Sequence, residues 1–90
     1  MSEDAPIWEV RQTRRFARTY KKLINAALIA DTDAAVATVA LSPDVGERKK
    51  GDLAQLWVHK FRSQGQLYLL GYSREDTVRL VYLEALGPHE

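Results

Sequence analysis

Cationic side chains gather around one alternating apolar segment of this sequence. Arg48, Lys49 and Lys50 precede the segment, and Lys60 and Arg62 lie within it. Because Lys60 and Arg62 are two residues apart, they share one face of a β-strand, opposite the face that carries the aromatic residues. They should therefore point away from a core. A polyanion could bind such a cluster of positive charge.

The segment itself predicts a β-hairpin. Leu53–Phe61 and Gln66–Tyr72 have the length and the Trp, Val, Phe and Leu content of strands, and Ser63-Gln64-Gly65 is a short Gly-containing break between them. His59 shares the aromatic face of the first strand, which favours a place in the core or at its rim. Glu84, further along the chain, could act as a general base or pair with a neighbouring cation.

Two helices are predicted before the hairpin. Thr13 is a candidate N-cap for a helix from Arg14 to about Ala30, whose apolar residues recur at spacings of three and four. Asp31 or Thr32 could cap a second helix, which should end at Pro43. The first helix would expose a basic face. Six cations lie within twelve residues here: Arg11, Arg14, Arg15, Arg18, Lys21 and Lys22.

Further strands are predicted at the two ends of the chain. The run 6–11 should open the sheet, and Ser73–Thr77 reads as a polar turn before a strand at Val78–Leu86 that is apolar on both faces and therefore central. The expected fold is α+β: an N-terminal strand, a helical hairpin and a three-stranded antiparallel meander, forming a four-stranded sheet. The sheet face away from the helices would be left to bind something.

Composition narrows the class of protein. Ninety residues, 46% hydrophobic and 28% charged with a net charge of +1, predict a single globular domain spanning residues 1–90. The absence of cysteine excludes disulfides, a thiolate zinc site and a cysteine nucleophile. With no secretory signal or membrane-length apolar run, we expect a cytoplasmic protein. We find no sequence motif for a metal, a cofactor or a Ser-His-Asp triad.

Several motifs, in this order, resemble the RelE/ParE superfamily of type II toxin–antitoxin toxins. They are the helix segment FARTYKKL at residues 16–23, a second helix ending at a Pro and a Gly, KGDL at residues 50–53 followed by Leu56-Trp57, a strand pair, and Gly87-Pro88-His89. The resemblance spans nearly the whole chain. His89 is similar to the C-terminal histidine of the YafQ-like branch.

The resemblance implies a toxin held inactive by an antitoxin, with which it forms a hetero-oligomer. RelE-like members cut mRNA on the ribosome without a metal, and this cleavage needs a base for the ribose 2′-hydroxyl, cations for the phosphorane and an acid for the leaving oxygen. The residues that match such catalytic positions are Lys50, Lys60, Arg62 and His89. The residues expected to contact RNA or phosphate are Arg48, Lys49 and Tyr68.

A second hypothesis is a ParE-like, non-enzymatic inhibitor of DNA gyrase. Tyr68 lies near the place where the family usually carries a strand arginine, and the sequence ends at Glu90 where the YafQ-like pattern continues with an aromatic residue. Both departures favour gyrase inhibition over cleavage. A third hypothesis is an inactive relic that only binds its antitoxin.

Overall fold

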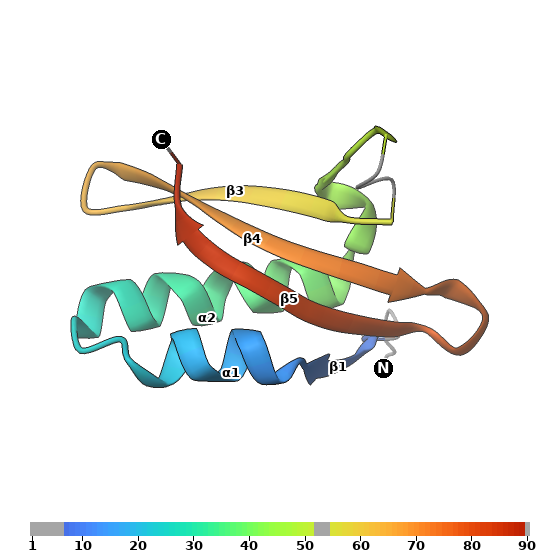
Figure 1. Cartoon of the computed structure of the whole chain (residues 1–90), viewed down its shortest axis with the longest axis horizontal. Helices are drawn as coiled ribbons and strands as arrows, with labels where there is room; N and C mark the ends of the chain where they lie inside the picture. The colour runs from blue at the N-terminus through green and yellow to red at the C-terminus, as the bar shows by residue number, and fades with distance from the viewer. Residues whose placement is uncertain (1–6, 52–54, 90) are drawn as a thin grey trace, which may run out of the picture.

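Two helices pack against one side of a five-stranded sheet (Figure 1). The computed structural model describes residues 7–51 and 55–89. The elements in chain order are β1 (Glu9–Gln12), α1 (Arg14–Lys21), α2 (Ala26–Leu41), the 3₁₀ turn η1 (Pro43–Val45), β2 (Glu47–Arg48), β3 (Trp57–Ser63), β4 (Gln66–Glu75), the 3₁₀ turn η3 (Asp76–Val78) and β5 (Leu80–Pro88). No helix among the described residues is long and apolar enough to span a bilayer.

The strand order is β1-β5-β4-β3-β2. Strands β3, β4 and β5 form the predicted antiparallel meander, while β1 pairs in parallel with β5 at one edge and β2 pairs with β3 at the other. The predicted α+β class and the central position of β5 are confirmed. The sheet has five strands rather than the predicted four, because β2 comprises only Glu47–Arg48 and leaves no alternating pattern to read.

The central hairpin is confirmed, and its turn is a two-residue loop. Ser63 pairs with Gln66, and the intervening Gln64 and Gly65 both have positive φ angles, 54° and 83°. Two consecutive residues with positive φ match the right-handed twist of the flanking strands, which is why such loops favour Gly. Strand β4 continues to Glu75, so the prediction that the polar turn starts at Ser73 was wrong. The predicted first residues of two strands, Pro6 and Leu53, lie outside the described residues, and the strands begin later, at Glu9 and Trp57. The last strand begins at Leu80 rather than Val78, which belongs to η3.

The boundary between the helices differs from the prediction. Thr13 caps α1 as expected, accepting a hydrogen bond from the Phe16 amide at 3.2 Å. However, α1 ends at Lys21, and Asn25 caps α2 by accepting from the Leu28 amide at 3.0 Å. Asn is as strong an N-cap as Asp. Thr32, predicted as a cap, instead lies fully buried inside α2.

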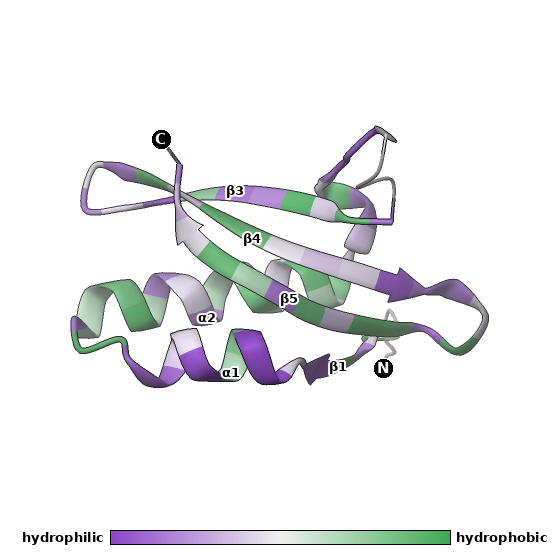
Figure 2. Cartoon of the chain, in the orientation of Figure 1, coloured by the Kyte–Doolittle hydropathy of each residue, from purple (hydrophilic) through white to green (hydrophobic). Residues whose placement is uncertain are grey.

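The core lies between the helices and the sheet. Phe16 and Val39 from the helices meet Leu70, Tyr72 and Val81 from the sheet, and all five are at most 2% exposed. Figure 2 colours much of α1 as hydrophilic and much of α2 as hydrophobic. Helix α1 contributes one buried side chain, Phe16, whereas α2 contributes four: Thr32, Ala35, Val39 and Ala40.

Candidate functional site

Strand β3 separates the core from a charged surface by the alternation of its side chains. Trp57 and Phe61 pack against the core on the helix side of the sheet. Lys60 and Arg62, on the other side, are exposed as predicted. Figure 1 shows both helices on one side of β3, β4 and β5, so the opposite surface, here called the open face, is free of helices in the described chain.

The predicted catalytic histidine lies on the same row of the open face as Arg62. Arg62 pairs with Leu67 of β4, and the His89 amide donates to the Leu67 carbonyl at 2.9 Å, continuing the ladder from β5. Residues directly opposite one another in neighbouring strands project on the same side of a sheet. Arg62 and His89 are thus two strands apart, roughly 10 Å between Cα atoms, with Lys60 one row away. A phosphodiester could contact all three side chains.

The cluster Arg48, Lys49 and Lys50 begins at the last residue of β2, at the other end of β3. The Lys49 amide donates to the Leu56 carbonyl at 2.8 Å, which holds the two sides of the connection to β3 together. A hollow of about 400 Å³ is lined by this cluster and Gly51. A second, of about 380 Å³, reaches from Val45 to Lys60. Arg48 pairs with Trp57 and therefore projects on the helix side, where it lines a further hollow with Trp57 and Arg74. The described cations of β3 on the open face are thus Lys60 and Arg62.

Tyr68 lies on the opposite side of the sheet from Lys60. It pairs with Phe61, and the two rings stack with their centroids 5.7 Å apart, half-buried on the helix side. His59 lies on this side too, and its partial burial lowers the pKa of its imidazole. Neither side chain shares the row of Arg62 and His89, which leaves His89 as the imidazole of the open face.

A carboxylate also lies on the open face. Glu84 accepts a hydrogen bond from the Ser73 hydroxyl at 2.7 Å, beside the register shift between Gly71 and Tyr72. The shift adds one residue to β5 and lets the Glu84 side chain reach Ser73. Within residues 7–51 and 55–89, no three His, Asp or Glu side chains are grouped closely enough to hold a metal ion.

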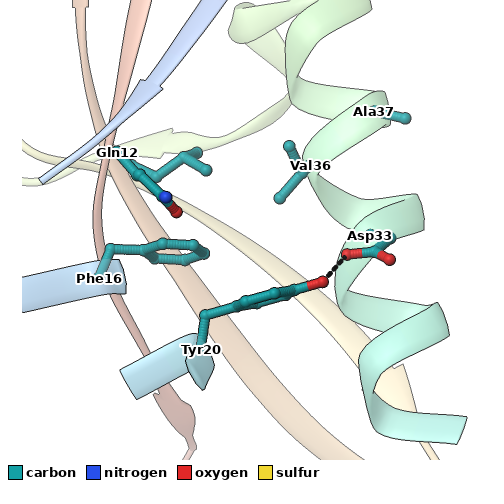
Figure 3. Close-up of a pocket in the computed structure, with 7 residues that line it drawn as sticks. Gln12, Phe16, Tyr20, Asp33, Val36 and Ala37 are labelled. Atoms are coloured by element: carbon teal, nitrogen blue, oxygen red, sulfur yellow. Dashed lines mark hydrogen bonds between the residues drawn. The ribbon is translucent and has the colours of Figure 1, made fainter. Parts of the chain in front are cut away.

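An apolar hollow of about 330 Å³ opens elsewhere, between α1 and α2. Phe16, Tyr20 and Val36 are among the residues that line it, and Tyr20 donates to Asp33 at 2.7 Å across its rim (Figure 3). It contains none of the predicted catalytic residues. Its walls suit an apolar side chain rather than a phosphate.

Sequence reasoning missed Arg74, which it assigned to a polar turn. Arg74 lies near the end of β4, where its guanidinium packs between the rings of Trp8 and Trp57 and forms ion pairs with Asp44 and Asp76. Asp44 is 30 residues away in the sequence. Only the extension of β4 beyond Tyr72 could have signalled this contact.

Known structures share this arrangement of helices and strands. The RelBE2 toxin–antitoxin complex of Mycobacterium tuberculosis matches with a TM-score of 0.76 and 25% identity, over 93% of this chain and 100% of that chain. The intact RelBE complex of E. coli matches with a TM-score of 0.73 and 22% identity, over 92% and 98%. The isolated E. coli RelE toxin matches with a TM-score of 0.73 and 22% identity, over 92% of this chain and 85% of that chain. The fold is thus that of RelE toxins.

The family follows from the sequence. A family model described as the ParE-like toxin of type II bacterial toxin–antitoxin systems matches residues 10–90. The chain therefore belongs to this family, within the RelE/ParE superfamily, as the sequence motifs predicted. No curated protein sequence matches the chain.

Proposed function

We propose that this protein is a ribosome-dependent endoribonuclease that cuts mRNA. The observation that carries the proposal is the common exposure of Lys60, Arg62 and His89 on one rigid sheet face without a covering helix. Rigid strands suit catalysis because they hold reacting groups in a fixed geometry. RelE toxins share the fold, and the family consists of toxins.

Each side chain has a role in a transfer that needs only protein groups. A base removes the ribose 2′ proton, the 2′ oxygen attacks the adjacent phosphorus, and the bond to the 5′ oxygen breaks as that oxygen gains a proton. In our assignment, His89 donates the proton that the leaving 5′ oxygen gains. Lys60, Arg62 and Lys50 stabilise the extra negative charge on the phosphorane. Lys49 binds a neighbouring phosphate. Arg48 and Tyr68, the other predicted RNA contacts, project on the helix side of the sheet and have no role in this assignment.

Two groups are candidates for the base that removes the 2′ proton, Glu84 and His89. Glu84 is a carboxylate on the open face, held by the Ser73 hydroxyl. A neutral imidazole at His89 can also accept a proton. Glu84→Gln separates the two: it slows cleavage strongly if Glu84 is the base and leaves the rate within a few-fold if His89 serves both steps.

An antitoxin is the proposed partner of the toxin in the cytoplasm. Two of the matching structures are toxin–antitoxin complexes, and in each the matched chain is covered almost completely by the alignment. An antitoxin that covers the open face or the helical hairpin would keep the toxin from the ribosome. The toxin and antitoxin would form a hetero-oligomer.

Induction of the chain in a bacterium, followed by mapping of mRNA 5′ ends, tests the proposed activity. New 5′ ends within translated codons, lost in a variant that carries Lys60→Ala and Arg62→Ala, are the expected result. Growth arrest without new 5′ ends would contradict cleavage.

The second candidate is a non-enzymatic inhibitor of DNA gyrase, favoured by the ParE-like description of the matching family. A supercoiling assay with purified gyrase and micromolar toxin separates the two candidates. Inhibition of supercoiling together with intact mRNA supports the gyrase function, whereas unimpeded supercoiling supports cleavage. A chain that causes neither effect, and no growth arrest, would be an antitoxin-binding relic.

A further inference from the structure

Two side chains of β4 hold the segment from which the cationic cluster emerges. The buried Tyr72 hydroxyl donates to the Pro43 carbonyl at 2.5 Å and accepts from the Gly46 amide at 3.1 Å. Arg74 donates from Nη1 to Asp44 at 2.7 Å. Both ends and the middle of the segment 43–46 are therefore bonded to one strand.

Arg74 is itself fixed from several sides. Its guanidinium carbon lies 5.1 Å from the ring centroid of Trp8 and 4.8 Å from that of Trp57. Nε and Nη2 donate to the Asp76 carboxylate at 2.8 and 3.2 Å. With a side chain only 12% exposed, Arg74 loses little further freedom when it binds Asp44.

The close fit at Gly46 indicates that the segment has one position. A Cβ atom at Gly46 would lie 2.3 Å from the Tyr72 hydroxyl oxygen, so no larger residue fits without movement of the buried ring. The chain then enters β2, which has only two residues paired with β3. Two pairs define the direction of the following residues poorly. The anchors at Asp44 and Gly46 supply what this short strand lacks.

We propose that Tyr72 and Arg74 are positioning residues for the cations Lys49 and Lys50. They act through the segment 43–46 and β2, and they keep both lysines at a fixed place relative to Lys60 on β3. Neither touches RNA, since Tyr72 is fully buried and Arg74 is enclosed by two indole rings. This inference rests on the proposed cleavage of mRNA, to which it adds the device that sets the geometry of the phosphate contacts.

The two carboxylates of Arg74 provide a matched test. Asp44→Asn and Asp76→Asn remove the same charge from the same arginine, and both side chains are well exposed, at 80% and 67%. Only Asp44 belongs to the segment that leads to the lysines. On programmed ribosomes we expect Asp44→Asn to lower kcat about tenfold with KM nearly unchanged, because misplaced catalytic groups slow the chemical step. Asp76→Asn should stay within about twofold of the wild type.

Amide hydrogen exchange gives a second measurement that does not depend on activity. The Gly46 and Lys49 amides donate to Tyr72 and Leu56, and both should exchange roughly threefold faster or more in Asp44→Asn and in Tyr72→Phe. In Asp76→Asn their exchange should match the wild type. A variant that loosens the whole fold would also speed the amides of β4 and β5, so these serve as the internal reference.

The outcomes separate this inference from the proposed function. Equal behaviour of Asp44→Asn and Asp76→Asn in both measurements overturns the positioning role. Slower cleavage in Asp44→Asn with unchanged exchange at Gly46 and Lys49 also overturns it. Faster exchange in Asp44→Asn, in a chain whose wild type cuts no mRNA, supports the anchoring of the segment and overturns the proposed function instead.

Discussion

The two faces of β3 and β4 differ in what they contribute to the molecule. On the helix side, Trp57 and Leu70 pack into the core, and Leu70 is fully buried. On the open face, Lys60 and Arg62 are exposed to solvent. The alternation of a single strand thus supplies the core and the candidate site together. Stability should depend on one face and function on the other, and the following predictions test this division.

Truncation on the helix side should have the largest effect on stability. Leu70→Ala removes a fully buried side chain from the central meander and should lower the free energy of unfolding by about 2–5 kcal/mol. Leu69 is the neighbouring residue and lies half-buried on the open face. Leu69→Ala should lower the free energy of unfolding by less than half as much. Urea denaturation of both variants measures the difference, and equal losses would contradict the division.

Loss of the Tyr72 hydroxyl should have the second largest effect on stability. Tyr72→Phe leaves the Pro43 carbonyl and the Gly46 amide without their partner, which should cost about 1–3 kcal/mol. Tyr82→Phe on the open face should change stability by less than about 0.5 kcal/mol. Thermal unfolding of the two variants provides the comparison. If Tyr82→Phe lowered stability as much as Tyr72→Phe, the division between the two faces would be contradicted.

Removing the open-face cations should change RNA binding while leaving stability almost unchanged. Lys60→Ala with Arg62→Ala should shift the unfolding free energy by less than about 0.5 kcal/mol. In a titration of single-stranded RNA, the slope of log affinity against log salt should fall by about 0.7 for each lost phosphate contact. An unchanged slope would mean that these side chains do not bind phosphate.

The pH dependence from His59 should be the smallest effect. Burial lowers the pKa of His59 in the folded chain, so the unfolded chain binds the proton first as the pH falls. Stability should therefore decrease below pH about 6.5, the value for an unperturbed histidine, and level off below the folded pKa. His59→Gln should remove part of this decrease. A stability that rises on acidification through this range, and loses that rise in His59→Gln, would reverse the assignment.

The features that sequence reasoning recovered are local. The turn at Gln64-Gly65 and the outward direction of Lys60 and Arg62 follow from turn chemistry and strand alternation, both of which act within a few residues. The helix boundary was misplaced because Asn25, Asp31 and Thr32 are comparable caps, and a local pattern does not reveal that Thr32 is fully buried inside α2.

Long-range contacts lay beyond the sequence. Arg74 meets Asp44 only because β4 continues beyond Tyr72 and passes beside η1. The row shared by Arg62 and His89 depends on the register of three strands, which no local pattern encodes. The types of the candidate residues could be predicted, but their common face and the contacts that fix it could not.

Cleavage of mRNA on purified ribosomes by matched cation variants tests the account most directly. Two double variants are compared. The open-face variant combines Lys60→Ala and His89→Ala, and the α1 variant combines Arg15→Ala and Arg18→Ala on the exposed face of that helix. At saturating ribosomes the open-face variant should cut about 100-fold more slowly or worse, and the α1 variant within about threefold of the wild type. Full activity in the open-face variant, or none in the wild type, would contradict the assignment of the chemistry to the open face.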